Sequence, residues 1–231
     1  MLRGMSAAPV FSEAIAAPML ADDLRLLHLD HQLVVANKPA GQLCVPGRGP
    51  ERTNCLWSRL QAEVADALVV HRLDMATSGL VMFGRGPAMR RRLSMLFEQR
   101  RVHKRYQAVV AGLVRGVCGE IALPLRADWD HRPRQQVQQL LGKPALTRWQ
   151  LISRDESAGT SRLWLMPETG RTHQLRVHLA AIGHAILGDA LYAPPPWAAA
   201  AVAPRLMLHA CTLRWDDDLT GPRHFDCTPP F

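Results

Sequence analysis

Residues 71–79 read HRLDMATSG and hold the side chain best suited to chemistry. Asp74 falls on a predicted tight turn leading into an apolar strand over residues 80–83, where a carboxylate beside Arg72 stays ionised and accessible to a ligand. Ordinary turn composition explains the same stretch, because Asp, Thr, Ser and Gly all favour turns. From local chemistry alone, a catalytic and a turn-forming interpretation of Asp74 both stay open.

Recognisable cofactor motifs are absent from the sequence. It contains no Walker loop, no HExxH pair and no dinucleotide-binding glycine pattern. The five cysteines are odd in number, widely spaced and never arranged as CxxC, which argues for reduced thiols in a cytoplasm rather than for disulfides or a zinc site. We therefore expect chemistry by side chains alone, with no cofactor and no metal, in a cytoplasmic protein.

The charge balance favours a polyanionic partner, since the formal net charge is +8. All but three of the 28 basic residues are Arg, whose planar guanidinium grips phosphate at two points. Arg-rich coding in a GC-rich genome explains the same bias. The run Arg90-Arg91-Arg92 likewise fits either a solvated helix face or an RNA contact.

The beginning of the chain differs in character from the rest. Residues 1–20 contain one Arg, Glu13 and two prolines instead of the compact apolar centre of a secretory signal. No apolar run approaches the roughly 18–20 residues that a membrane span needs, so no membrane partner is expected. We expect residues 1–22 to form a flexible arm and residues 23–231 to form one catalytic domain.

The elements that must position Asp74 mix short strands with helices. Alternating or continuous apolar residues predict a strand-rich segment over 24–37 and strands over 80–83, 106–110, 148–152 and 162–166. Helical spacing predicts helices over 56–68, from Pro87 through Phe97, and from a Thr172 N-cap to Gly183. Since regular βαβ alternation is missing, we expect an α+β fold, with flanking helices around a mixed, mainly antiparallel sheet.

Residues 71–79 resemble the catalytic loop HRLDxxTSG of the RluA family of RNA pseudouridine synthases. The resemblance continues in family order along the chain from about residue 24. The other matching segments are 37–41 (NKPAG), 45–48 (VPGR), 104–112 (KRYQAVVAG), 143–147 (KPALT), 169–178 (TGRTHQLRVH), 183–189 and 208–210 (LHA). Ordered agreement at that many segments implies the pseudouridine synthase fold and activity.

The resemblance also implies roles for individual residues. Asp74 corresponds to the family's nucleophile, Tyr106 to a candidate base and Arg176 to the arginine that pairs with the nucleophile. Arg72 corresponds to the side chain that fills the space left by a flipped uridine, with His71 supporting the loop. The other implied substrate-binding positions are Thr77, Arg171, His173 and Leu208. Taken alone, Tyr106 suggests a packed strand aromatic and Arg176 a surface arginine of a helix.

Structured RNA is the partner that the resemblance implies. The compact RluA branch modifies uridine 32 of certain tRNAs and uridine 746 of 23S rRNA, so we expect a tRNA anticodon stem-loop, a 23S rRNA stem-loop or both. The short arm leaves no room for the S4 RNA-binding domain of larger family members. The single domain is therefore expected to recognise RNA by itself, as a monomer.

Two other function classes compete with this prediction. A catalytically silent RNA-binding protein on the same fold is disfavoured because Asp74, Tyr106 and Arg176 are all retained. A glycosidase would need two carboxylates flanking the scissile bond. Asp189 is the only second acid that we expect near Asp74, and we expect it to be structural.

Overall fold

The computed structural model describes residues 24–47, 49, 53–199, 201–218 and 221–231. The expected flexible arm, residues 1–22, lies outside these ranges. Among the helices of the described residues, none is long and apolar enough to cross a membrane.

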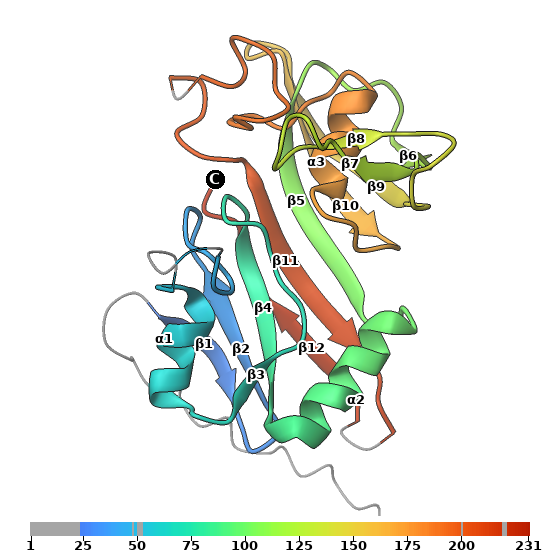
Figure 1. The fold of residues 1–231 in the computed structure, drawn as a ribbon. Helices are drawn as coiled ribbons and strands as arrows, with labels where there is room; N and C mark the ends of the chain where they lie inside the picture. Colours follow the sequence, from blue (N-terminus) through green and yellow to red (C-terminus); the bar gives the residue numbers. More distant parts are fainter. Residues whose placement is uncertain (1–23, 48, 50–52, 200, 219–220) are drawn as a thin grey trace, which may run out of the picture.

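A mixed sheet of ten strands runs through the described part of the chain (Figure 1). Its order is β1-β2-β4-β11-β5-β10-β9-β6, with β12 paired to β11 and β3 paired to β4. The strands of the sheet are β1 (Arg25–Leu29), β2 (Leu33–Lys38), β3 (Ala67–Val69), β4 (Ser78–Arg85), β5 (His103–Ala111), β6 (Cys118–Ile121), β9 (Thr147–Asp155), β10 (Thr160–Pro167), β11 (Leu208–Trp215) and β12 (Arg223–Asp226). All their pairings are antiparallel except β4 with β11. The predicted α+β class with a mainly antiparallel sheet is confirmed.

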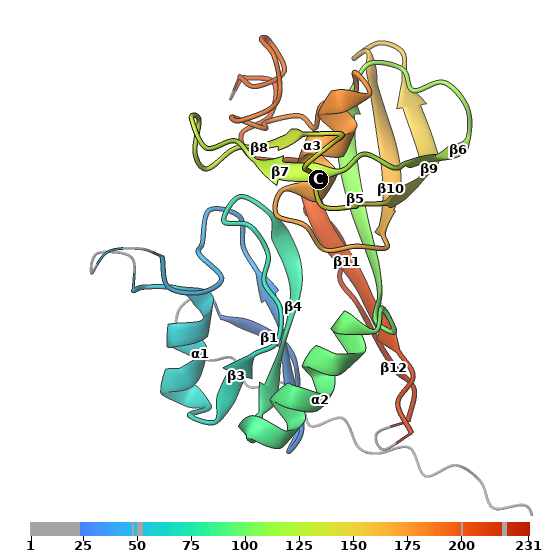
Figure 2. The same cartoon turned by 45° about the vertical axis from the view of Figure 1, so that its right-hand side comes forward.

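The helices divide between the two ends of this sheet. α1 (Leu56–Glu63) and α2 (Gly86–Glu98) lie against the end that contains β1, β2, β3 and β4 (Figure 1). α3 (Gln174–Ala181) lies at the other end, beside a separate hairpin of β7 (Leu125–Ala127) and β8 (Gln135–Val137) (Figure 2). The two halves of the molecule are therefore built differently, and both contribute segments that the sequence singled out.

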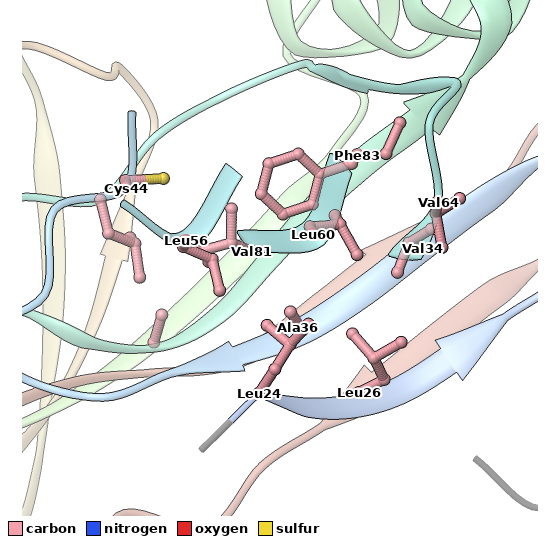
Figure 3. Packing of buried hydrophobic residues seen from close by; sticks show 13 residues of the cluster. Leu24, Leu26, Val34, Ala36, Cys44, Leu56, Leu60, Val64, Val81 and Phe83 are labelled. Carbon is pink, nitrogen blue, oxygen red and sulfur yellow. The ribbon is translucent and has the colours of Figure 1, made fainter. Parts of the chain in front are cut away.

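The halves are packed around separate hydrophobic clusters, of which the two largest border strand β5. Figure 3 shows the first core, where Leu56 and Leu60 of α1 pack over Val34 of β2 and over Val81 and Phe83 of β4. The second core lies under α3 and includes apolar residues of β5, β10 and β11. Tyr106 contacts both cores, so the strand that carries it is held from each side.

The parallel contact between β4 and β11 joins the halves directly beside the residue 71–79 loop. Ser78 and Gly79 pair there with His209 and Ala210. Gly79 has φ of 111°, and a Cβ at this position would lie 2.3 Å from the Ala210 carbonyl oxygen. Only glycine allows this approach, which brings the end of the Asp74 loop against β11.

In the N-terminal half one predicted boundary is wrong, whereas the predicted strand-rich segment is confirmed. The helix expected over 56–68 ends at Glu63, and Val64 is its C-cap, because the chain turns there to begin β3. The Trp57 indole donates to the Ala67 carbonyl at 2.9 Å and ties that strand back to the helix. The strand-rich segment 24–37 is two strands, separated by a turn in which Asp30 accepts from the amides of Gln32 and Leu33.

The predicted N-cap of α3 is also wrong, whereas its end is confirmed. His173 rather than Thr172 is the N-cap, with φ of 54° and no side-chain capping bond. The Gln174 carboxamide oxygen takes over this task, since it accepts from the Arg171 amide at 3.0 Å and from the Thr169 hydroxyl at 2.6 Å. Gly183 follows the helix with φ of 83°, as a helix-stopping glycine does.

The arginine run on α2 is partly used inside the protein. Arg92 forms a bidentate pair with the buried Asp217, and Arg90 donates to the Val69 carbonyl at 3.3 Å. Arg91 is exposed. The helix that begins near Pro87 is confirmed, and two of its three consecutive arginines have structural partners.

Candidate active site

One cleft of about 540 Å³ lies between the two halves and brings the predicted site residues together. Its lining includes all nine of them: His71, Arg72, Asp74, Thr77, Tyr106, Arg171, His173, Arg176 and Leu208. These residues come from the loop before β4, from β5, from the segment that enters α3 and from β11. Positions separated by more than a hundred residues in the sequence thus share one cavity.

Buried Lys38 holds the loop that carries Asp74. Its ammonium donates to the carbonyl oxygens of Pro39, Gln42 and Met75 at 2.7, 2.9 and 3.0 Å. The Gly41 amide donates to the same Met75 oxygen at 2.8 Å. Met75 is the residue that directly follows Asp74. Burial lowers the pKa of Lys38 to about 8, while the charge of Asp74 opposes that shift. The family-like segment 37–41 therefore serves as the support of the Asp74 loop.

Asp74 faces two nitrogen groups of α3 and its N-cap. Its carboxylate lies 3.8 Å from Arg176 Nη1 and 3.9 Å from His173 Nε2, and its side chain is 21% exposed. The carboxylate is therefore within electrostatic reach of the Arg176 guanidinium. It is also open enough to meet a ligand in the cleft.

Arg176 makes its tight ion pair with Asp189 rather than with Asp74. The guanidinium donates from Nε and Nη2 to the two Asp189 oxygens at 2.7 and 2.6 Å, and both residues are buried. The pairing expected from the resemblance is therefore the longer of two contacts. Burial lowers the pKa of Arg176, but its bonds to Asp189 outweigh burial and raise it. Asp189 thus holds Arg176 charged, with Nη1 left to face Asp74.

Tyr192 contributes a second support that the sequence did not reveal. Its hydroxyl oxygen accepts from the Gln135 amide at 2.8 Å and lies 2.7 Å from His173 Nδ1. Because the hydroxyl oxygen already accepts from Gln135, the phenol donates its own hydrogen to Nδ1 of His173. The imidazole then carries its hydrogen on Nε2, which faces Asp74. Burial is the main cause that lowers the pKa of His173, against the opposing charge of Asp74. These contacts favour a neutral imidazole whose Nε2–H faces the carboxylate at 3.9 Å, which is beyond hydrogen-bond distance.

Tyr106 is a protonated phenol in this cleft. Burial chiefly, and the charge of Asp74 second, raise its pKa above the ordinary value for tyrosine.

Leu208 and Thr77 are buried parts of the same lining, while Arg72 is exposed. Arg171 is exposed too and donates to the Pro144 carbonyl at 3.1 Å. The cleft thus combines a buried apolar and phenolic part with exposed arginines.

Two acids other than Asp74, Glu98 and Glu168, line the cleft, whereas Asp189, the second acid that we expected there, is not among its lining residues. Glu168 is 3.3 Å from Arg148 and Glu98 is exposed. Among the described residues, the ion pairs of Asp74 are those with His173 and Arg176. Asp189 is structural in the sense expected, since both of its oxygens are bound to Arg176.

His71 supports the loop from within the protein. Its Nε2 accepts from the Met82 amide at 3.0 Å, and its ring stacks on Phe97 with centroids 4.5 Å apart. Burial first, and the charge of Lys104 second, lower the pKa of His71 to about 3. The unfolded chain takes up this proton near pH 6.5, so the stabilising contribution of neutral His71 is lost as pH falls from 6.5 toward 3.

We expect this loss to be visible in unfolding measurements. The difference in free energy of unfolding between wild type and His71→Gln should narrow between pH 7 and pH 5, because only the wild type must protonate a buried imidazole on unfolding. Urea denaturation at both pH values measures it. His31→Gln, at an exposed position, is the control. A difference that stays constant or widens in acid would contradict the buried neutral His71.

Comparison with known proteins identifies the class to which this fold and cleft belong. The human RNA Pseudouridylate Synthase Domain Containing 1 structure has a TM-score of 0.77 and 28% identity, covering 94% of this chain and 87% of that one. The human Domain Containing 4 structure shares the fold, with a TM-score of 0.72 at 24% identity over 89% of this chain and 88% of that one. The fold is that of the pseudouridine synthases.

Sequence comparison narrows the class to a family. The family described as RNA pseudouridylate synthase matches residues 32–181. Proteins named dual-specificity RNA pseudouridine synthase RluA are 46% identical in Vibrio cholerae, over 81% of this chain and 75% of theirs, and 46% identical in Yersinia pestis, over 89% and 99%. The Escherichia coli protein of that name is 45% identical over 81% of this chain and 84% of its own. This chain belongs to the RluA family of RNA pseudouridine synthases.

Proposed function

We propose that this protein isomerises specific uridines to pseudouridine in structured RNA, with Asp74 as the nucleophile. The observation that carries the proposal is the Asp74 carboxylate itself, accessible in the cleft and within 4 Å of Arg176 and His173. Family membership supplies the reaction class, since the relatives carry that activity in their names.

The reaction exchanges one bond to the ribose for another. The bond from C1′ to N1 of the base breaks, the base turns, a bond from C1′ to C5 forms, and the C5 hydrogen is replaced by one on N1. No electron and no phosphate is transferred, so the balance requires no redox or nucleotide cofactor. The carboxylate of Asp74 attacks the sugar or the base ring and leaves again when the new bond forms.

Tyr106 is proposed to take the proton from C5. In the free protein its pKa is raised, partly by the charge of Asp74. The C5 proton becomes acidic only after C5 has bonded to C1′. The protonated phenol balances the exchange by giving its own proton to N1 of the turned base and taking the proton from C5. Arg176 and His173 would stabilise the carboxylate before attack and after release.

Arg72 is proposed to hold the target uridine outside the RNA stack. It is exposed at the cleft that contains Asp74, and a stacked uridine cannot reach that carboxylate without being flipped. Flipping costs a few kcal/mol, and a guanidinium placed in the vacated stack offsets part of that cost. Selectivity then depends on how easily the RNA releases the uridine.

The proposed substrates are short stem-loops, read mainly through their shape. The relatives' names describe dual-specificity RNA enzymes, and the resemblance points to uridine 32 of tRNA and uridine 746 of 23S rRNA. A net charge of +8 supports recognition through phosphates by the catalytic domain itself. We propose further that the protein acts in the cytoplasm as a monomer.

Tritium release from RNA labelled at C5 of uridine tests the function directly. A minimal anticodon-type hairpin should release tritium with wild-type protein, and pseudouridine should appear at one position. No release from either the tRNA-type or the 23S rRNA-type hairpin, at enzyme excess, would refute the proposed activity on these substrates.

We expect Arg72→Ala to slow single-turnover modification of such a hairpin by about 10- to 100-fold, because the flipped state loses its support. A uridine made easier to flip by a neighbouring mismatch should recover part of the rate. Arg91→Ala, at an exposed arginine of α2, is the matched control and should retain the wild-type rate.

The same series should be repeated at increasing salt, where affinity should fall because phosphate contacts release counterions. Linear RNA modified as fast as the hairpin, or affinity unchanged by salt, would contradict recognition by shape and phosphate contacts.

A further inference from the structure

The loop between β7 and β8 exposes a large aromatic side chain to solvent. Trp129 is 60% exposed, whereas the other five tryptophans of the chain are all at least partly buried. Tryptophan is usually well buried, because exposing the apolar surface of its large ring to water costs free energy. The exposure of this ring, in a molecule whose other tryptophans are at least partly buried, points to a ligand that covers it.

An arginine is already stacked on that ring. The Arg132 guanidinium carbon lies 3.8 Å from the Trp129 ring centroid. Backbone bonds close the loop around the pair, from Asp128 N to the Arg134 oxygen at 3.0 Å and from Arg134 N to the His131 oxygen at 2.9 Å. The aromatic and the cation are thus presented together on a hydrogen-bonded turn rather than on a free tail.

The hairpin is connected to the active site through Tyr192. The Gln135 amide at the start of β8 donates to the Tyr192 hydroxyl, which contacts His173 of the cleft at 2.7 Å. The Arg134 guanidinium lies over the Tyr192 ring at 5.5 Å. Figure 2 shows β7 and β8 beside α3, the helix that carries Arg176. RNA bound in the cleft therefore has this loop as a neighbour.

The charges of the hairpin suit a nucleic acid. Arg126, Arg132 and Arg134 are exposed, against two acids, Asp128 and Asp130. Asp128 already lies 3.2 Å from the His131 ring. Every nucleobase has an aromatic face that stacks on indole or guanidinium, and the phosphate of the nucleotide pairs with arginine. An aromatic next to arginines matches an unpaired nucleotide in both respects.

We propose that residues 128–134 form a second nucleotide site, in which Trp129 and Arg132 stack an unpaired base of the RNA substrate other than the target uridine. This inference rests on the proposed function, because it adds a contact to the same RNA. Trp129 and Arg132 contribute to affinity and to the choice of loop sequence, while the chemical step stays with Asp74.

Direct hairpin binding and single-turnover kinetics test this second site together. Trp129→Ala should raise both the dissociation constant and the half-saturating concentration by about 5- to 100-fold, the range for loss of one base stack. The maximal rate should stay at the wild-type value. Trp129→Phe should retain most of the affinity, since phenylalanine still stacks. Val117→Ala and Arg115→Ala, exposed positions between β5 and β6, are the controls.

Abasic substitutions identify the nucleotide. At one position in the hairpin loop, removal of the base should weaken wild-type binding as much as Trp129→Ala does, and should weaken the variant no further. Unchanged binding by Trp129→Ala, a loss confined to the maximal rate, or additive effects at every loop position would each overturn the proposal. Binding is measured whether or not the RNA is turned over, and absent turnover by wild type would contradict only the proposed function.

Discussion

We expect Asp74→Asn to abolish pseudouridine formation, with a rate more than about 1,000-fold below wild type, because an amide cannot replace the nucleophilic carboxylate. The fold should be nearly unaffected. Its nearest nitrogen partners, the Arg176 guanidinium and the His173 imidazole, lie 3.8 and 3.9 Å away, and they have other, shorter contacts to Asp189 and Tyr192 respectively.

Tritium release, urea denaturation and hairpin affinity should be measured on the same preparation of Asp74→Asn. Asp216→Asn, at an exposed carboxylate, is the matched control and should keep wild-type activity. If Asp74→Asn retained more than a few per cent of the wild-type rate, Asp74 would not be the nucleophile.

Asp189→Asn should have the largest effect on stability. It leaves the Arg176 guanidinium, which is only 5% exposed, without its hydrogen-bonded counter-charge, so that only the more distant Asp74 remains beside it. Breaking a buried ion pair on one side costs about 3–5 kcal/mol of unfolding free energy. Activity should fall as well, because Arg176 Nη1 is no longer held toward Asp74.

Asp66→Asn is the matched control for this loss. It removes the same charge from the partly exposed pair with Arg85, where about 0–1 kcal/mol is expected. Urea denaturation of both variants compares them. Equal losses for Asp189→Asn and Asp66→Asn would show that the buried pair is not a support of the site.

The residues that make up the site were largely predictable from the motifs, although the contacts between them were not. Residues 71–79, 104–112, 169–178 and 208–210 are far apart in sequence, and strand pairing brings them to one cleft. No pattern in the sequence shows that Arg176 binds Asp189 more tightly than Asp74. That preference depends on the path of the segment that joins Arg176 to Asp189, and this path is set by packing.

Tyr192 was the functional neighbour that sequence reasoning missed. It is one of only two tyrosines, and it follows Asp189 by three residues, which is the signal that could have identified it. Its contact with Gln135 depends on the β7–β8 hairpin, and neither of these strands has a strong apolar alternation. Short, half-exposed strands of this kind are specified by tertiary contacts more than by local pattern.

The end of the first helix was mispredicted for a related reason. Val64 and Leu68 continue the helical spacing of Leu56 and Leu60, so periodicity extends the helix beyond its end. The chain leaves the helix at Val64 because residues 67–69 pair with β4 instead. Pairing with β4, the next strand of the chain, overrides the helical period that Val64 and Leu68 would extend.

The central claim is that this cleft, through Asp74, forms pseudouridine in structured RNA. Mapping pseudouridine in total RNA tests it most directly, in cells with the gene, without it, and complemented by wild type or by Asp74→Asn. We predict that deletion removes pseudouridine from one or a few stem-loop uridines, and that wild type alone restores it. An unchanged map after deletion, or restoration by Asp74→Asn, would contradict the claim.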